Sequence, residues 1–138
     1  MKFELLTLTG TKFDGEANEV VLNTSVGQIG VLPHHEPLTA IAVAGPVEVK
    51  DRSGHNSLFA IFGGVLEVTK DYVRLLADEA EHEDELIESE IQAALEEAEK
   101  LKANAKTQHQ LIAADRMIDR SNVRLGVAKL KRRHRRNI

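Results

Sequence analysis

Residues 58–80 decide the fold, and they read LFAIFGGVLEVTKDYVRLLADEA. Short runs rich in Leu, Ile, Val and Phe are interrupted by Gly63-Gly64, and apolar and polar residues alternate in Leu66-Glu67-Val68. Alternation of this kind predicts half-buried β-strands, and a glycine pair between two runs predicts a turn that joins them. After Ala80 the apolar residues begin to recur at helical spacing. The stretch therefore marks the end of a β-rich part and the start of a helical part.

The strand-like pattern extends upstream from this stretch to Met1. Turn signals such as Asp14-Gly15, Gly45-Pro46 and Ser53-Gly54 separate the apolar runs. Many short strands at close spacing favour an antiparallel sandwich or barrel. The predicted strands are Phe3–Leu8, Ala17–Asn23, Gln28–Leu32, Leu38–Val43, Pro46–Val49, Leu58–Phe62, Val65–Thr69 and Tyr72–Leu76.

Downstream of Ala80, the apolar residues predict a first helix. They recur at intervals of three and four and form one stripe, while glutamates occupy much of the remaining surface. Asp84 is the predicted N-cap. The stripe breaks around residues 104–110, where we expect a turn. The stripe consists of Ile87, Ile91, Ala94, Leu95, Ala98 and Leu101.

A second helix is expected over about Leu111–Lys131. A row of large residues and a row of small residues each repeat every seven positions, which lets another helix approach closely. Gly126 costs about 1 kcal/mol in a helix interior, so we expect fraying near it. The two helices could pack on each other as an antiparallel hairpin, or each could dock on another surface. The large row is Leu111, Ile118 and Leu125, and the small row is Ala114, Ser121 and Ala128.

The composition argues against several classes of protein. The chain has no Cys, which excludes disulfides, thiol nucleophiles and thiolate zinc sites, and with no Trp, one Tyr and four Phe it is poorly suited to stacking on nucleobases. Residues 78–99 hold 11 acidic residues and no Lys or Arg, whereas residues 100–138 hold 12 Lys or Arg and two Asp. A charge difference of this size between neighbouring segments indicates a partner surface or a tail. Neither an export signal nor an apolar run of spanning length occurs, so we expect a cytosolic protein.

Two motifs in the strand-rich part point to a known family. Residues 27–38 read GQIGVLPHHEPL, and residues 62–68 read FGGVLEV, followed by Val73-Arg74-Leu75-Leu76-Ala77-Asp78. In order and spacing over about residues 1–81, this pattern resembles the epsilon subunit of F-type ATP synthases. The acidic linker and the two-helix tail are similar in kind. The first motif alone also fits an ordinary tight turn, but the two together favour the family.

The resemblance implies a fold and a set of partners. It implies an all-β N-terminal sandwich of about ten strands in two sheets (residues 1–83) and a C-terminal antiparallel helical hairpin (residues 84–138). It further implies one copy per complex, bound to the gamma subunit and to the ring of c subunits. Such a subunit couples proton-driven ring rotation to the catalytic head, and its helices can rise toward the beta and alpha subunits to inhibit ATP hydrolysis. We therefore expect a peripheral protein at the cytoplasmic face of a bacterial plasma membrane.

The resemblance also assigns roles within the first motif. By family position the ring-facing residues are Gln28, Ile29, Gly30, Val31, Leu32 and Pro33, and His35 lies near gamma. Glycines permit sharp backbone paths and prolines fix φ, so the loop is expected to present a rigid surface. Many relatives carry an acid where Gln28 stands, so a neutral hydrogen bond would here replace a charge pair.

Metal binding and catalysis are not expected. His34-His35-Glu36 offers three ligand types, but adjacent residues of an extended segment point to opposite faces, and no second ligand pair lies nearby at the usual spacing. Sequence motifs for a nucleophile elbow, a phosphate-binding loop or a zinc protease are absent. The chain is therefore expected to have no metal, no cofactor and no catalytic residue of its own.

ATP binding is expected to be weak or absent. Some bacterial relatives bind ATP through a hydrophobic-Asp-x-x-Arg-Ala sequence on the first helix and arginines on the second. Here Glu88 stands at best for the Asp, and the first Arg is missing, although Arg120 and Arg124 match the second-helix positions. Losing that guanidinium removes a charge-assisted phosphate contact worth about 1.5–3 kcal/mol.

Basic residues form a stripe on the second helix. Arg116, Arg120 and Arg124 are spaced by four and so share one face, and Lys129–Arg136 extends the positive charge. The stripe could inhibit the enzyme by meeting an acidic region of the beta subunits, form a solvated tail, or contact anionic lipid. An alternative for the whole chain is a free-standing sandwich adaptor whose basic helix binds nucleic acid.

Overall fold

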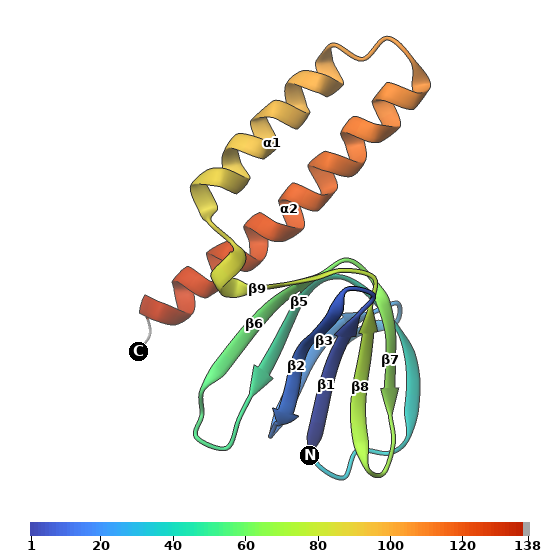
Figure 1. Ribbon diagram of the computed structural model, residues 1–138, viewed down its shortest axis with the longest axis vertical. Coiled ribbons are helices and arrows are strands. Elements are labelled where there is room, and N and C mark those ends of the chain that lie inside the picture. The colour runs from blue at the N-terminus through green and yellow to red at the C-terminus, as the bar shows by residue number, and fades with distance from the viewer. Residues whose placement is uncertain (137–138) are drawn as a thin grey trace. The chain divides into compact units, whose positions relative to one another are not determined.

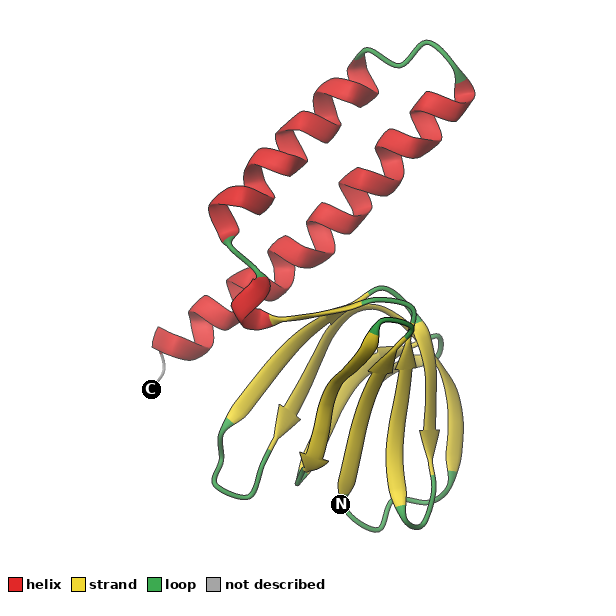
Figure 2. Cartoon of the chain, in the orientation of Figure 1, coloured by secondary structure: helices red, strands yellow, loops and turns green. Residues whose placement is uncertain are grey.

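The computed structural model describes residues 1–136, and it divides into two compact units between Glu83 and Asp84 (Figures 1 and 2). The first unit is built of nine strands and the second of two long helices. This order confirms the predicted fold class. The strands are β1 Lys2–Thr7, β2 Gly10–Glu16, β3 Glu19–Thr24, β4 Gly27–Val31, β5 Leu38–Lys50, β6 Asn56–Ile61, β7 Gly64–Val68, β8 Tyr72–Ala77 and β9 Ala80–His82.

The long strand β5 joins the two layers of the sandwich. Its first half, Leu38–Ala42, pairs with β7 in a layer ordered β2-β1-β8-β7-β5. Its second half, Gly45–Lys50, pairs with β6 in a layer that also contains β3, β4 and β9. The pairing of β3 with β5 shifts register between Leu22 and Thr24, beside this change of layer. All strand pairs are antiparallel except β1 with β8.

The core between the two layers consists of the inward-facing residues, which are every second residue along each strand. Phe3 and Leu5 of β1 are fully buried, and so are Leu66 of β7 and Leu75 of β8. The period of two in these strands therefore places one face in the core and leaves the other for solvent or partners.

The nine strands differ from the eight strand ranges predicted from the sequence at three places. Gly45-Pro46 was expected to be a turn between two strands, yet it lies inside the 13-residue strand β5. Gly45 has a φ of +153°, so the strand bends there without ending. Two strands were also missed: β2, which lacks an apolar alternation, and the three-residue β9.

The second unit is an antiparallel pair of helices, α1 (Glu88–Ala103) and α2 (Gln108–Arg136), preceded by a short 3-10 helix, Glu83–Glu85. The helices pack on each other, so of the two arrangements left open by the sequence, the structure has the hairpin. Ile91, Leu95 and Ala98 of α1 are buried. The whole small row of α2, Ala114, Ser121 and Ala128, is buried as well, as expected for a row that allows close approach.

Three predicted helix details are wrong. Asp84 is not the N-cap, because the short 3-10 helix precedes α1 and the N-cap position falls to Ile87, which makes no side-chain capping bond. The second helix ends at Arg136 rather than near Lys131. It also continues through Gly126 without interruption, since the residues on both sides of the glycine, Leu125 and Val127, are buried and hold the helix in place.

Candidate functional site: the loop end of the sandwich

The residues predicted to face a ring alternate along β4. Gln28 and Gly30 are exposed, whereas Ile29 packs against the core and Val31 is fully buried. Leu32 and Pro33 follow the strand, and 54% of the Leu32 surface is accessible. Four of the six side-chain positions, all but Ile29 and Val31, are thus available to a partner, because a strand must turn every second residue inward.

A tight turn follows β4. The backbone NH of His35 donates to the carbonyl of Leu32 at 3.1 Å, which closes a four-residue turn with Pro33 at its second position. His34, at the third position, has a φ of +68°. Proline followed by a positive φ defines a type II turn, which usually has glycine at this third position. The side chain of His34 is exposed, so the turn presents an imidazole at the surface.

His35 points back along its own loop. Its Nδ1 lies 2.7 Å from the carbonyl oxygen of Glu36, and the side chain is half-buried. Because a carbonyl can only accept, Nδ1 donates, and in the neutral ring Nε2 is left as an acceptor. His35 is therefore ready to receive a hydrogen bond from a partner, and His34, His35 and Glu36 do not converge on one point.

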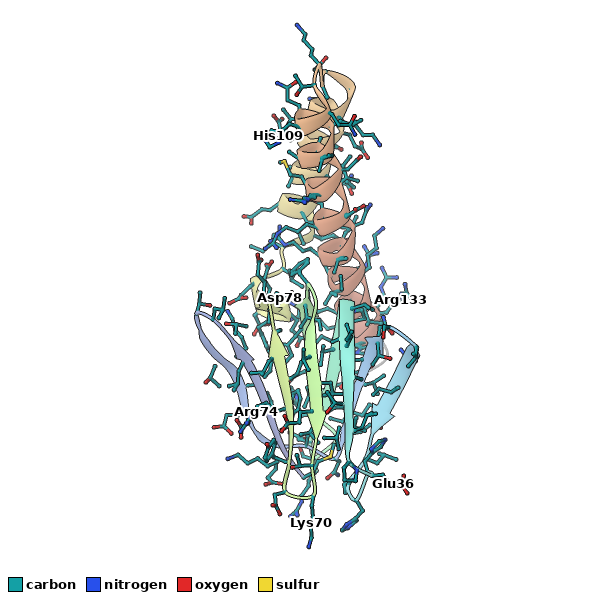
Figure 3. All side chains as sticks on the ribbon, turned by 90° about the vertical axis from the view of Figure 1, so that its right-hand side faces the viewer. Glu36, Lys70, Arg74, Asp78, His109 and Arg133 are labelled. Carbon is teal, nitrogen blue, oxygen red and sulfur yellow. The ribbon has the colours of Figure 1, made fainter. Side chains whose placement is uncertain are left out.

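A cleft of about 670 Å³ opens beside this turn. One wall is the segment Leu32–Pro37 and the other is Val68–Val73, which holds the β7–β8 turn. Arg52 and Lys70 bring positive charge to the cleft. Glu36 and Lys70 lie at the same end of the sandwich (Figure 3). We call this end, formed by Leu32–Pro37 and Val68–Val73, the loop end. Sequence reasoning found only the first wall.

Tyr72 connects the cleft to the outer face of the sheet. Its hydroxyl donates to a carboxylate oxygen of Glu67, and this hydrogen bond raises the pKa of Tyr72 above its ordinary value. The Arg74 guanidinium lies 4.3 Å from the centre of the Tyr72 ring and 3.4 Å from Glu4, which raises the pKa of Arg74. These contacts hold Tyr72 in one orientation at the edge of the cleft.

Another pKa shift lies in the β5–β6 turn. Asp51 accepts hydrogen bonds from the Ser53 hydroxyl at 2.7 Å and from two backbone NH groups, and these bonds lower the pKa of its carboxyl. The carboxylate organises the turn beside Arg52, which is a structural role.

Ion pairs at both ends of the helical hairpin define its register. Lys102 pairs with Asp115 at 2.9 Å near the tip, and Arg132 pairs with Glu88 at 3.2 Å near the base, where Lys131 lies 3.6 Å from Asp84. The pairs near the base were not predicted, because only the tertiary register brings these residues together.

This register separates the residues considered for ATP. Glu88 lies opposite Arg132, and Arg124 is eight residues before Arg132 on α2, which is about 12 Å along the helix axis. Arg120 is a further turn away. Arg120 and Arg124 lie one turn apart on α2 and are both half-buried, with the exposed Arg116 one turn beyond. The hairpin does not bring them to Glu88, which lies opposite Arg132.

Within residues 1–136, no cluster of three His, Asp or Glu side chains is placed to hold a metal ion. In the same residues, neither helix is long and apolar enough to cross a membrane.

The fold and the site define a two-domain protein, a β-sandwich with a stiff loop end followed by a charged helical hairpin. Residues 1–83 match the family model described as the β-sandwich domain of the ATP synthase delta/epsilon chain. An ATP synthase epsilon chain of Caldanaerobacter subterraneus subsp. tengcongensis is 36% identical over 126 residues, which cover 91% of each chain. One of Lacticaseibacillus casei is 32% identical, covering 90% of this chain and 93% of its own length. The chain therefore belongs to the family of ATP synthase epsilon subunits.

A solved structure supports the fold. A chain in the Euglena gracilis mitochondrial ATP synthase, in a structure containing OSCP, F1 and the c-ring, superposes with a TM-score of 0.72 at 22% identity, covering 92% of this chain and 76% of that chain. At this identity the likeness concerns the fold alone.

Proposed function

We propose that the chain is a rotor part of a proton-translocating F-type ATP synthase. In this role the sandwich couples rotation of the c-ring to the catalytic head, and the helical hairpin inhibits ATP hydrolysis. One copy per complex sits on gamma and the c-ring, peripheral to the membrane at its cytoplasmic face. Family membership supports this role, and the stiff loop end is the observation that carries it.

The coupling role rests on the geometry of the loop end. The type II turn, with Pro33 and the positive φ of His34, holds the loop in a single shape. Gly30 on β4 and Leu32 and Pro33 on the turn are exposed near this end, and Gln28 is exposed at the start of β4. A rigid surface of this kind can transmit torque, because little of the binding free energy is lost in ordering it. In the proposed assembly these residues contact the ring, and His35 contacts gamma.

Capture of the ring by the purified chain tests this role. Leu32→Asp should weaken binding to a gamma–c-ring assembly, because it places a charge in the contact. Ile112→Asp is the matched control, since Ile112 is 44% exposed and lies on α2, outside the sandwich. Equal effects of the two substitutions would refute the assignment of this surface. Capture of RNA without gamma by the wild-type chain would favour the nucleic-acid adaptor instead.

The inhibitory role rests on the basic face of α2. Arg116, Arg120 and Arg124 share this face. We propose that the hairpin opens and that the stripe then meets acidic side chains of the beta subunits. Arg120→Ala with Arg124→Ala should raise ATP hydrolysis by the reconstituted enzyme, and high salt should do the same, because the contact is Coulombic.

Two controls accompany this test. Arg133→Ala with Arg135→Ala removes the same charge from exposed positions outside the stripe. A chain ending at Glu83 keeps every core residue of the sandwich and β9, and it should bind gamma while releasing hydrolysis completely. If hydrolysis stays unchanged in the shortened chain, the hairpin is not an inhibitor.

A further inference from the structure

Two ion pairs join the end of α2 to the segment that leads into α1. Lys131 Nζ lies 3.6 Å from a carboxylate oxygen of Asp84, and Arg132 Nη1 lies 3.2 Å from one of Glu88. Figure 1 shows this segment passing beside α2 before α1 begins. We call Asp84 and Glu88 the internal acids. They reach their partners only in the closed hairpin, because the packing of α2 on α1 brings the two ends together.

The basic end of α2 has no acid of its own. After Asp119 the sequence contains eight Lys or Arg and no Asp or Glu. Like charges three or four residues apart on a helix repel each other, although the helix dipole favours cations in the last turn. Residues 84–90 carry four carboxylates and no Lys or Arg, and two of these carboxylates make the pairs above. The charge of α2 is thus partly neutralised from outside the helix.

Leu86 anchors the internal acids beside α2. It stands between them in the sequence, is 4% exposed, and lines a pocket of about 340 Å³ together with Ala128 and Lys131 of α2. Because burial of Leu86 already orders the segment, the internal acids lose little freedom when they pair. They are therefore well placed to hold the end of α2.

Lys131 also extends the basic face proposed to inhibit hydrolysis. It follows Arg124 by seven residues, or about two turns, so it projects from nearly the same side of α2 as the stripe of Arg116, Arg120 and Arg124. A partner with acidic side chains along that face would reach Lys131 as well. In the closed hairpin the Lys131 side chain is only 17% exposed and lies beside Asp84, so this position is already taken.

The two pairs are weak enough to be displaced. The side chains of Asp84 and Arg132 are 70% and 52% exposed, and ion pairs with this much access to solvent shift an equilibrium only slightly. They can therefore bias the hairpin toward the closed state without locking it.

We propose that Asp84 and Glu88 compete with the acidic partner of the hairpin for the end of α2. This inference rests on the proposed function, in which the hairpin opens and α2 meets acidic side chains of the beta subunits. When the hairpin opens, Lys131 and Arg132 lose the internal acids and become available to that partner. The internal acids thus set how readily the chain inhibits.

The test measures ATP hydrolysis by the enzyme reconstituted with full-length chains. Asp84→Asn with Glu88→Gln removes both carboxylates at nearly constant volume, and it should lower hydrolysis about threefold, because the competitor for the cations is lost. High salt should reduce this difference. Glu90→Gln with Glu97→Gln is the matched control, since it removes the same charge from exposed positions, one of them also in the first turn of α1. The control should leave hydrolysis unchanged.

A second variant separates competition from a simple loss of hairpin stability. It adds Lys131→Gln and Arg132→Gln to the first variant, so the closed hairpin lacks the same two ion pairs, and the open hairpin now lacks the two cations. Hydrolysis should then return to the wild-type rate or exceed it. Equal inhibition by the two variants would mean that these cations do not contact the partner, and it would overturn the inference.

Hydrogen exchange of the isolated chain provides a readout that needs no partner. Amides of residues 121–130 should exchange about threefold faster in the first variant than in the wild type or the control. Faster exchange without stronger inhibition would overturn the competition while leaving the proposed function intact. Failure of the wild-type chain to inhibit hydrolysis would overturn the inhibitory half of the proposed function and this inference together.

Discussion

A Cβ atom on Gly64 of β7 would lie 2.2 Å from the carbonyl oxygen of Leu76 on β8. It would also lie 2.8 Å from the Cα of Ala77, the residue with which Gly64 pairs. Gly64 has a φ of +153°, a backbone conformation that other residues rarely adopt. The β7–β8 hairpin therefore depends on the missing side chain, which explains the second glycine of the Gly63-Gly64 pair.

Gly64→Ala should lower the free energy of unfolding by about 2–5 kcal/mol, because backbone atoms must move and the φ is strained. Chemical denaturation of the full chain measures this. Gly54→Ala is the control, since Gly54 also has a positive φ, +85°, but open space around it. Gly54→Ala should lower the free energy of unfolding by only about 1 kcal/mol. A similar cost for both would mean that the close approach to β8 contributes nothing.

The sequence predicts an element well where its signal is local. The change of period after Ala80, the Gly63-Gly64 turn and the small row of α2 are all patterns within a few residues, and each describes the structure. The turn predicted at Gly45-Pro46 is wrong, because the same dipeptide can form a turn or a bend within a strand. Only the pairing of β5 with strands of both layers decides between them. Strand β2 was not predicted, because it is defined by its pairing with β1 rather than by a pattern of apolar residues.

The sequence likewise predicts the parts of the candidate site that depend on local residues and misses those that depend on strand pairing. The stiffness of the turn at Pro33 follows from proline itself. The second wall of the cleft lies beside the first because β5 pairs with β7, Leu38 with Val68, and no short window of sequence reports a pairing between such distant residues. Val31 was expected to face a ring and is instead in the core, because the inward side of β4 depends on its register with β3.

The single tyrosine of the chain provides a direct optical test of the Tyr72–Glu67 hydrogen bond. Because there is no Trp, the ultraviolet absorbance of tyrosinate during alkaline titration reports Tyr72 alone. We expect a pKa above the ordinary value of about 10, since the bond to Glu67 favours the protonated hydroxyl. Glu67→Gln should lower this pKa, whereas Glu36→Gln should leave it unchanged. A wild-type pKa at or below the ordinary value would contradict the bond.

The same bond predicts how stability depends on pH. A raised pKa in the folded chain means that folding favours protonated Tyr72. Its contribution is therefore complete below the ordinary tyrosine pKa and disappears as the pH rises through the folded value. Unfolding midpoints measured across this alkaline range should fall more steeply for the wild type than for Tyr72→Phe. Parallel curves for the two proteins would show that Tyr72 is not linked to folding.

His34 occupies a turn position that suits glycine. With a φ of +68°, a β-branched residue is strongly disfavoured there, so His34→Val should lower the unfolding free energy by about 1–2 kcal/mol. His34→Gly should not lower it, because the strain it relieves offsets the added freedom of the unfolded chain. Comparing the melting temperatures of the two variants checks this. Equal destabilisation by Val and Gly would mean that the imidazole itself, rather than the backbone, stabilises the loop.

The close approach of α1 and α2 depends on the small row of α2. Ala114 is 2% exposed, so a larger side chain there must push the helices apart at a cost of about 1–3 kcal/mol. Ala114→Leu should therefore speed hydrogen exchange of α1 amides about 10- to 100-fold in the full-length chain, with strand amides unaffected. Ala113→Leu makes the same change one position earlier, where the side chain is exposed, and leucine is a good helix former, so exchange should stay near wild type.

Ion pairs on the surface contribute at most about 1 kcal/mol each, so Lys102→Ala, which breaks the pair with Asp115, should have a smaller effect than Ala114→Leu. The reverse order would mean that charge, and not packing, holds the hairpin closed.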